Sequence, residues 1–236
     1  GDDQLISLDV AEVSSKRMYK PQDLVAAPRV LGVDPARFGD DRSVIFKRQG
    51  PQAFPALVYR GVDNMQLADL VAQAIGDWHP DAVFIDSGAG AGVIDRLKQL
   101  GYHIIEVPFG GRANRHTLHV NRRTEMWFEM RDWLQGGGAI PDSLSLKQEL
   151  ATPTYSFDSQ GRRVLESKDQ IKKRLQNAGS PDLADAAFLA LDCARQRMGL
   201  VAVDPPEDSA NGQPYRRTTI KQLGTALQNR DAVLLD

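Results

Sequence analysis

Three aspartates that lie far apart in the chain are the residues best suited to chemistry. Asp34 ends the apolar run 30–33, and Asp86 ends a second apolar run, 82–85. Asp185 lies at the start of a helical pattern in the later part of the chain. An ionised carboxylate at the end of a buried strand is costly unless a cation compensates its charge. If the three segments converge, their oxygens form a cage suited to Mg²⁺ or Mn²⁺, so the sequence predicts metal-dependent phosphodiester chemistry.

Each of these acids also has a simpler explanation. Asp34 precedes a charged turn, and an aspartate commonly caps the backbone of such a turn. Asp182, three residues before Asp185, suits the start of a helix as a capping residue. Capping explains Asp185 less well, because its helix carries buried-type residues on much of its surface: Leu183, Ala186, Ala187, Ala190 and Leu191. A buried acid needs a partner, and a metal ion is one candidate.

A run of glycines follows Asp86, in the segment 87–92. A glycine loop between a strand and a helix can bind phosphate through backbone N–H groups. The spacing here is Gly-x-Gly-x-Gly, which differs from the dinucleotide-binding motif, and the strand is the fourth rather than the first. We therefore expect a loop whose glycines let the backbone turn sharply beside a metal-holding Asp86.

Other motifs exclude several classes of enzyme. The chain has no Gly-x-x-x-x-Gly-Lys-Ser/Thr loop of a P-loop ATPase and no Gly-x-Ser-x-Gly nucleophile elbow. Its histidines show no metal-ligand spacing with cysteine, although the pair His116 and His119 leaves a weaker metal-binding alternative open. Cys193 is the only cysteine, so no intrachain disulfide can form, and its apolar helical surroundings predict a core residue.

The composition is that of a globular protein with one domain of about 200 residues plus tails. Of the 236 residues, 42% are hydrophobic and 25% are charged, and the net charge is −2. No global basic field is present, so binding to nucleic acid requires a local basic groove. No apolar stretch approaches the roughly 18–20 residues that span a bilayer, and the N-terminus lacks a signal pattern. We therefore expect a cytosolic protein with no membrane partner, and the absence of an initial Met suggests a fragment of a longer chain.

Basic residues cluster locally in the later half of the chain. The candidates for DNA binding are Arg122, Arg123, Arg162, Arg163, Lys168 and Lys172. A solvated helix face explains the group around Lys168 and Lys172 equally well. If the fold brings these groups beside the acids, they would contact phosphates on either side of the cut.

Apolar runs and turn signals predict an α/β fold. The expected strands cover residues 30–34, 43–47, 56–61, 82–86 and 103–107. Helical spacing predicts helices at 67–78 and 93–100, between the later strands. This β-β-β-α-β-α-β order predicts an antiparallel meander followed by parallel crossovers.

The second half predicts further helices and one hairpin. The expected helices cover residues 121–135, 144–150, 169–177 and 182–197. The turn 158–161 separates the two short strands of the hairpin. Residues 1–27 suggest a leading helix or linker, and the Pro, Asp, Asn and Gly content of 204–214 indicates a flexible segment. Residues 223–236 are a candidate helix or docking peptide.

In combination, several segments resemble the C-terminal nuclease domain of the large terminase subunit of tailed bacteriophages. They are residues 32–43, 84–92, 107–111 with 121–126, and 180–187. The resemblance covers about residues 28–198 and implies an RNase H-like α/β fold, with a mixed central sheet flanked by helices. It divides the chain into a linker or remnant of a preceding ATPase domain (1–27), the nuclease domain (28–203) and a flexible C-terminal tail (204–236).

The resemblance also implies a reaction and its residues. Asp34, Asp86 and Asp185 would be catalytic, and with Asp182 they would bind two divalent cations, Mg²⁺ or Mn²⁺; Asp41 is a possible auxiliary acid. One ion would activate the attacking water and the other would stabilise the leaving 3′ oxygen. The enzyme would be an endonuclease that cuts double-stranded concatemeric viral DNA during packaging, with little sequence specificity. Its setting would be the cytoplasm of the infected bacterial host, and its partners the portal ring and the small terminase subunit.

Three alternatives stay open. Another RNase H-like nuclease, such as a Holliday-junction resolvase, shares the acids but would prefer branched DNA. An ATPase of the actin or sugar-kinase type also begins with an Asp-bearing strand, but it would need a duplicated α/β domain. A docking module would depend on the tail, residues 204–236, and not on the acids.

Overall fold

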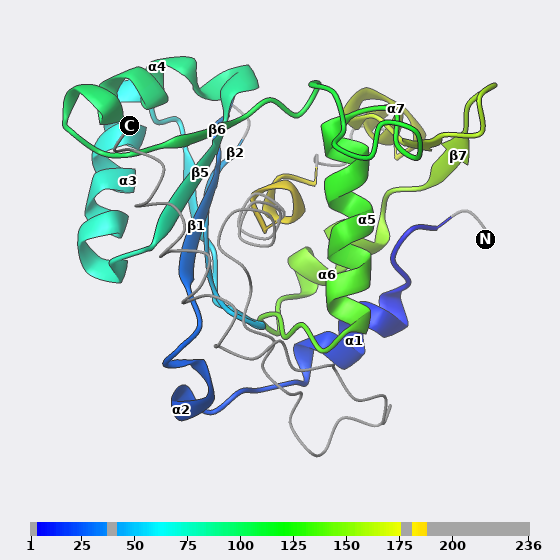
Figure 1. The fold of residues 1–236 in the computed structure, drawn as a ribbon, viewed down its shortest axis with the longest axis horizontal. Helices are drawn as coiled ribbons and strands as arrows, with labels where there is room; N and C mark the ends of the chain where they lie inside the picture. Colours follow the sequence, from blue (N-terminus) through cyan, green and yellow to red (C-terminus); the bar gives the residue numbers. More distant parts are fainter. Residues whose placement is uncertain (1–3, 37–41, 176–180, 188–236) are drawn as a thin grey trace, which may run out of the picture.

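The structure of the protein is a computed structural model that describes residues 4–36, 42–175 and 181–187. Asp41, Cys193 and the tail 204–236 lie outside these ranges, so the predictions for them stay predictions. The described part is a central sheet with helices on both faces (Figure 1). Within these ranges, no helix combines the length and the hydrophobicity of a membrane span.

The central sheet is mixed. Its strands are β1 (Arg29–Asp34), β2 (Arg42–Gln49), β3 (Gln52–Ala53), β4 (Leu57–Arg60), β5 (Ala82–Asp86) and β6 (Ile105–Val107). The order is β3-β2-β1-β5-β6, and β4 also pairs with β2. Strand β1 is antiparallel to β2 and parallel to β5, which is parallel to β6. The predicted meander followed by parallel crossovers is therefore confirmed, and β3 is a short addition that pairs with the end of β2.

Alternate side chains of β1 and β5 separate into two hydrophobic cores, as the two-residue period of a strand requires. Leu31, Val33 and Ile85 face one layer of helices, whereas Val30 and Phe84 face the other. Every residue of β5 is buried. Because both faces are covered, the strand has a continuous apolar sequence rather than an alternating one.

The helices follow local capping signals. They are α1 (Leu8–Ser15), α2 (Pro21–Leu24), α3 (Asn64–Trp78), α4 (Ser87–Gln99), α5 (Arg122–Gln135), α6 (Leu144–Ala151) and α7 (Lys168–Arg174). Asp63 and Gln66 form a capping box at the start of α3, and the Asn121 side chain accepts from Thr124 N at the start of α5. Helices α3 and α4 cover one face of the sheet, and α5 and α6 lie on the other side (Figure 1). The hairpin consists of β7 (Tyr155–Phe157) and β8 (Arg163–Leu165), as predicted.

The leading segment, residues 4–27, packs against the rest of the described fold. Leu5, Ile6 and Ala11 are buried in the core that contains the helices α5 and α6. Tyr19 donates a hydrogen bond to the carbonyl of Gly137 at 2.8 Å, just after α5. The segment therefore contributes to the same core as the strands, and its origin as a linker or ATPase remnant stays a prediction.

The glycine loop predicted after Asp86 is wrong, because α4 begins immediately after β5 and contains those glycines. Asp86 is the N-cap residue and its side chain accepts from Gly88 N at 3.1 Å. The helix approaches the strand ends closely: a Cβ on Gly90 would lie 2.9 Å from Cγ of Pro35. The prediction was wrong because glycine is a poor helix former. The close packing of α4 against Pro35 explains why Gly90 is there.

Candidate active site

The strand ends and the last described helical residues bring four aspartates to one place. Asp34 ends β1, Asp86 ends the neighbouring parallel strand β5, and Asp182 and Asp185 lie in the helical residues 182–187. All four are buried, and Asp185 is fully inaccessible. Asp34, Asp86 and Asp182 line a pocket of about 660 Å³ at this edge of the sheet. The carboxyl ends of the parallel strands β1 and β5 meet at one edge of the sheet, which brings Asp34 and Asp86 together.

Lys168 lies among these acids. Its Nζ is 3.0 Å from Oδ2 of Asp185, 3.4 Å from Oδ2 of Asp34 and 3.4 Å from Oδ1 of Asp182. The lysine is the first residue of α7, and the Ser167 capping box fixes the start of that helix. One ammonium therefore compensates carboxylates from two separate segments, as buried charges require.

Helix α5 holds the other side of Asp185. The indole Nε1 of Trp127 donates to Asp185 Oδ1 at 2.9 Å, and Nε of Arg123 lies 3.3 Å from the same oxygen. Oδ2 of Asp185 is buried and faces the ammonium of Lys168 at 3.0 Å. One oxygen is thus fixed by α5, and the other is directed toward the centre of the cluster.

The pKa values of the cluster reflect its crowded negative charge. Burial, together with the charges of Asp185, Asp182 and Asp86, raises the pKa of Asp34 to about 8. Burial also raises the pKa of Asp86. Burial alone would raise the pKa of Asp185, but the charges of Arg123 and Lys168 lower it below its ordinary value. The cluster therefore resists full ionisation unless more positive charge enters.

The donor set fits hard divalent cations, because it consists of carboxylate oxygens. Within the described ranges, no three His, Cys, Asp or Glu side chains are grouped closely enough to hold a metal in this arrangement. The ammonium of Lys168 lies among Asp34, Asp182 and Asp185 instead. Asp34, Asp86, Asp182 and Asp185 are thus the side chains that could hold metal ions if Lys168 moves aside.

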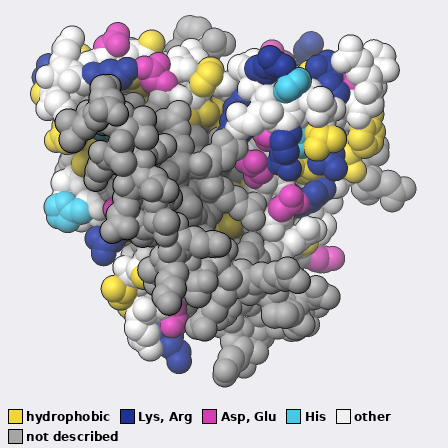
Figure 2. Space-filling model, viewed as in Figure 1, with side chains coloured by type: hydrophobic (Ala, Val, Ile, Leu, Met, Phe, Trp, Pro, Cys, Tyr) yellow, Lys and Arg dark blue, Asp and Glu magenta, His cyan; other side chains and the backbone are white. Residues whose placement is uncertain are grey.

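The predicted DNA-binding residues fall into two groups. Arg123, Lys168 and Lys172 line the acidic pocket. The other three do not line it: Arg122 pairs with Glu125, Arg162 pairs with Asp158, and the guanidinium of Arg163 lies 4.5 Å from the Phe128 ring centroid. Figure 2 shows Lys and Arg side chains mixed with acidic ones at the upper right, over the region of α7 and β7.

The histidine pair does not have the character of a metal site. His119 is fully buried, and its ring lies 5.2 Å from the ring of Phe128. Among the residues that the structure describes, neither ring nitrogen of His119 has a hydrogen-bond partner. His116 is exposed in the same loop. The described geometry therefore favours a packing role for His119.

Sequence reasoning missed three residues that contact the acids or the segment that carries them: Trp127, Arg42 and Glu149. The sequence around Trp127 gives no local signal that its indole N–H has an acid partner. Arg42 lines the pocket at the start of β2, and its Nε lies 3.5 Å from Oδ2 of Asp182. Glu149 joins Arg42 from α6. Contacts between segments this far apart have no signature in the spacing of residues.

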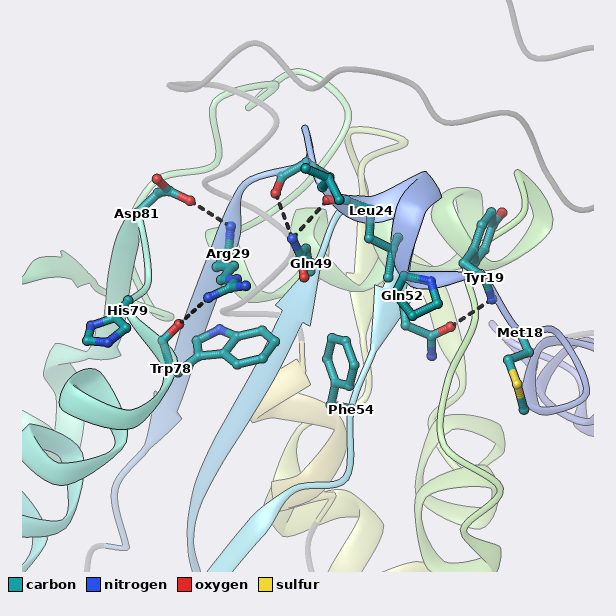
Figure 3. Close-up of a pocket in the computed structure, with 13 residues that line it drawn as sticks. Met18, Tyr19, Leu24, Arg29, Gln49, Gln52, Phe54, Trp78, His79 and Asp81 are labelled. Carbon is teal, nitrogen blue, oxygen red and sulfur yellow. Dashed lines mark hydrogen bonds between the residues drawn. The ribbon is translucent and has the colours of Figure 1, made fainter.

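A second pocket lies at the opposite end of β1 (Figure 3). Its volume is about 720 Å³, and its lining includes Arg29, the first residue of the strand that ends at Asp34. Phe54 and Trp78 meet there edge to face at 5.0 Å, and the Arg29 guanidinium lies 5.1 Å from the Trp78 ring centroid. None of the candidate acids lines it, so the acidic pocket is the candidate active site.

No protein-family profile and no curated protein sequence matches the chain. Solved structures do match. A mutant nuclease domain of the large terminase subunit gp2 of bacterial virus Sf6, with manganese and beta-thujaplicinol, has a TM-score of 0.69 at 18% identity, covering 80% of this chain and 99% of that one. The large terminase nuclease from thermophilic phage G20c with bound magnesium has a TM-score of 0.60 at 14% identity, covering 81% of this chain and 97% of that one.

The large terminase nuclease domain of Thermus phage P74-26 also matches, with a TM-score of 0.52 at 15% identity, over 73% of this chain and 80% of that one. At such low identity these likenesses concern the fold. They agree with the mixed sheet flanked by helices and with the resemblance drawn from the sequence. The chain has the RNase H-like fold of large terminase nuclease domains.

Proposed function

We propose that this chain is a metal-dependent endodeoxyribonuclease, the nuclease domain of a phage large terminase subunit. The observation that carries the proposal is the meeting of Asp34, Asp86, Asp182 and Asp185 in one buried cluster at the strand ends of this fold. A structural role alone does not explain four buried acids, since each costs free energy that a hydrophobic side chain would not.

The cofactors would be two divalent cations, Mg²⁺ or Mn²⁺. The neighbouring structures include terminase nucleases with manganese and with magnesium, which supports this choice. Asp34, Asp86, Asp182 and Asp185 would hold the ions. When bound, such ions lower the pKa of a water molecule and stabilise the negative charge of a leaving oxygen.

The chain's own residues hold and orient the acids. Trp127 and Arg123 fix one oxygen of Asp185, and the backbone N–H of Gly88 fixes Asp86. Lys168 balances the charge of the cluster in the absence of metal. For divalent cations to bind, the ammonium must release some of these oxygens, and it would then be free to contact a DNA phosphate within the same pocket.

Double-stranded DNA would be the substrate, as concatemers of the viral genome during packaging. Lys172 and Arg123 line the pocket and would contact phosphates rather than bases. Cleavage would therefore have little sequence specificity and would weaken as salt concentration rises. Residues 28–203 would form the nuclease domain, and 204–236 a C-terminal tail. The partners would be the portal ring and the small terminase subunit, in the cytoplasm of the bacterial host.

The experiment compares DNA substrates with the purified chain in Mg²⁺, in Mn²⁺ and in EDTA. The proposal predicts metal-dependent cutting of linear duplexes of unrelated sequence at similar rates, and inhibition by added salt. Cutting confined to a four-way junction would contradict it and would favour a Holliday-junction resolvase. Hydrolysis of ATP without DNA cleavage would favour an ATPase instead.

A further inference from the structure

Glu149 of α6 has a largely buried side chain that does not line the acidic pocket. It nevertheless contacts the segment that carries Asp182 and Asp185. Its Oε2 accepts from the backbone N–H of Leu183 at 2.8 Å and of Ala184 at 3.3 Å. These two residues lie between Asp182 and Asp185. The helical residues 182–187 lie between the central sheet and α5 (Figure 1), so their placement decides where both acids point.

The start of this helix needs an acceptor from elsewhere. The first backbone N–H groups of a helix have no partner within the helix, and a Ser, Thr, Asp or Asn just before it usually accepts from them. Here the preceding residue is Pro181, which has no side-chain acceptor. Glu149 supplies the acceptor from 34 and 35 positions earlier in the chain. Its negative charge also suits the N-terminal end of a helix.

The same carboxylate is linked to the side chain of Asp182. Nη2 of Arg42 lies 2.7 Å from Oε1 of Glu149, and Nε of Arg42 lies 3.5 Å from Oδ2 of Asp182. One oxygen of Glu149 therefore holds the backbone of the helix, and the other orients the arginine that contacts Asp182. Backbone and side chain are both restrained by one residue outside the pocket.

We propose that Glu149 is a positioning residue for the metal-holding acids. By fixing the start of the helical residues 182–187, it would hold the carboxylates of Asp182 and Asp185 close to those of Asp34 and Asp86. The inference rests on the proposed function, because it assigns Glu149 to the geometry of that site. Residues that orient metal ligands without touching the metal commonly change metal affinity by about 10- to 100-fold when they are replaced.

Two substitutions separate the contacts of Glu149. Glu149→Gln keeps a carbonyl oxygen for the backbone N–H groups and removes the charge that pairs with Arg42. Glu149→Ala removes both contacts. The matched control is Glu12→Gln, because Glu12 pairs at 2.9 Å with Lys147 of the same helix α6 and lines no part of the acidic pocket.

The experiment measures Mn²⁺ binding by calorimetry at a temperature where circular dichroism shows each variant folded. Cleavage of plasmid DNA then gives the Mn²⁺ concentration for half-maximal rate and the KM for DNA. We expect Glu149→Ala to weaken Mn²⁺ binding about 10- to 100-fold and Glu149→Gln to weaken it less. The KM for DNA of the Glu149 variants should stay within about twofold of wild type. The control Glu12→Gln should bind Mn²⁺ with an affinity within about twofold of wild type.

If Glu149→Ala does not fold, Glu149→Gln alone decides the matter. Folded Glu149 variants that bind Mn²⁺ as tightly as wild type would overturn the positioning role, whatever their melting temperatures. A wild-type chain that binds Mn²⁺ and does not cut DNA would count against the proposed nuclease, and the order of affinities would still support or reject the role of Glu149. A wild-type chain that binds no Mn²⁺ would overturn both.

Discussion

The Nζ atom of Lys168 lies 3.0 Å from Oδ2 of Asp185, the most deeply buried acid of the cluster. This pair joins the first residue of α7 to the helical residues 182–187. The ammonium lies among three of the four acids that would hold divalent cations. The balance between this ammonium and the carboxylates should therefore affect both the stability of the folded chain and its binding of metal ions.

Lys168→Ala should destabilise the chain without metal, because Asp34, Asp182 and Asp185 then lose their shared cation. Lys168 is partly exposed, so we expect a loss of about 1–3 kcal/mol in the free energy of unfolding in EDTA. Mn²⁺ should restore the lost stability, because it binds only the folded cluster. Thermal melts in EDTA and in Mn²⁺ measure both effects. Equal melting temperatures of wild type and variant in EDTA would show that Lys168 does not compensate the acids.

Trp127→Phe should weaken metal binding through Asp185. The substitution keeps an aromatic ring and removes the N–H that donates to Asp185 Oδ1 at 2.9 Å. A buried acceptor that loses its donor costs about 1–3 kcal/mol. Trp133→Phe, on the same helix but outside the cluster, is the matched control. Calorimetric titration with Mn²⁺ should show a loss of affinity for the first variant only; an equal loss in both would assign the effect to α5 packing.

Gly90→Ala should destabilise the fold at the site, although alanine is a better helix former. Its Cβ would lie 2.9 Å from Cγ of Pro35 and 3.0 Å from Cγ2 of Ile85. Overpacking of this kind costs about 1–3 kcal/mol. Apart from neighbouring backbone of α3, the added Cβ of Gly76→Ala would meet no atom of the described residues within 4 Å, so this substitution should stabilise the chain by up to about 1 kcal/mol. Urea denaturation compares the two, and stabilisation by both would mean that α4 tolerates the added methyl group.

The sequence predicts strands and helices correctly where neighbouring residues determine their structure. The continuous apolar runs of β1 and β5, each ended by an acid, follow from burial on both faces and the shared edge of parallel strands. The start of α4 was missed because its glycines lower helix propensity, while the close contact with Pro35 that requires one of them is remote in sequence.

The interior of the candidate site was harder to predict for a similar reason. Lys168 belongs to a basic run that looks like a solvated helix face, and only the packing of α7 places it among the acids. Trp127 and Glu149 act on residues 182–187 across long sequence separations. Residue types and spacing identify acids at strand ends, but they do not identify the side chains that hold those acids.

Stability should fall in mild acid because of His119. Burial, together with the positive charges of Arg115 and Arg163, lowers its pKa to about 4. The unfolded chain binds the proton near pH 6.5, so the folded state is at full stability above that pH and loses stability as the pH falls toward 4. The loss due to this residue should be at most about 3 kcal/mol at pH 4.

His119→Leu should remove that part of the pH dependence, as measured by urea denaturation at pH 7, 5.5 and 4. His116→Leu, in the same loop but exposed, is the control and should leave the profile unchanged. Parallel profiles of wild type and His119→Leu would mean that His119 becomes protonated in the folded protein.

Cleavage of supercoiled plasmid by the purified chain is the most direct test of the central claim, that the acid cluster is a metal-dependent nuclease site. It should be run in Mg²⁺, Mn²⁺ and EDTA, with Asp34→Asn, Asp185→Asn and the control Asp158→Asn, which lies on the hairpin turn. We predict cleavage only with metal, a loss of at least about 100-fold in both site variants, and wild-type cleavage by the control. Metal-dependent cleavage that survives in folded Asp34→Asn would contradict the account.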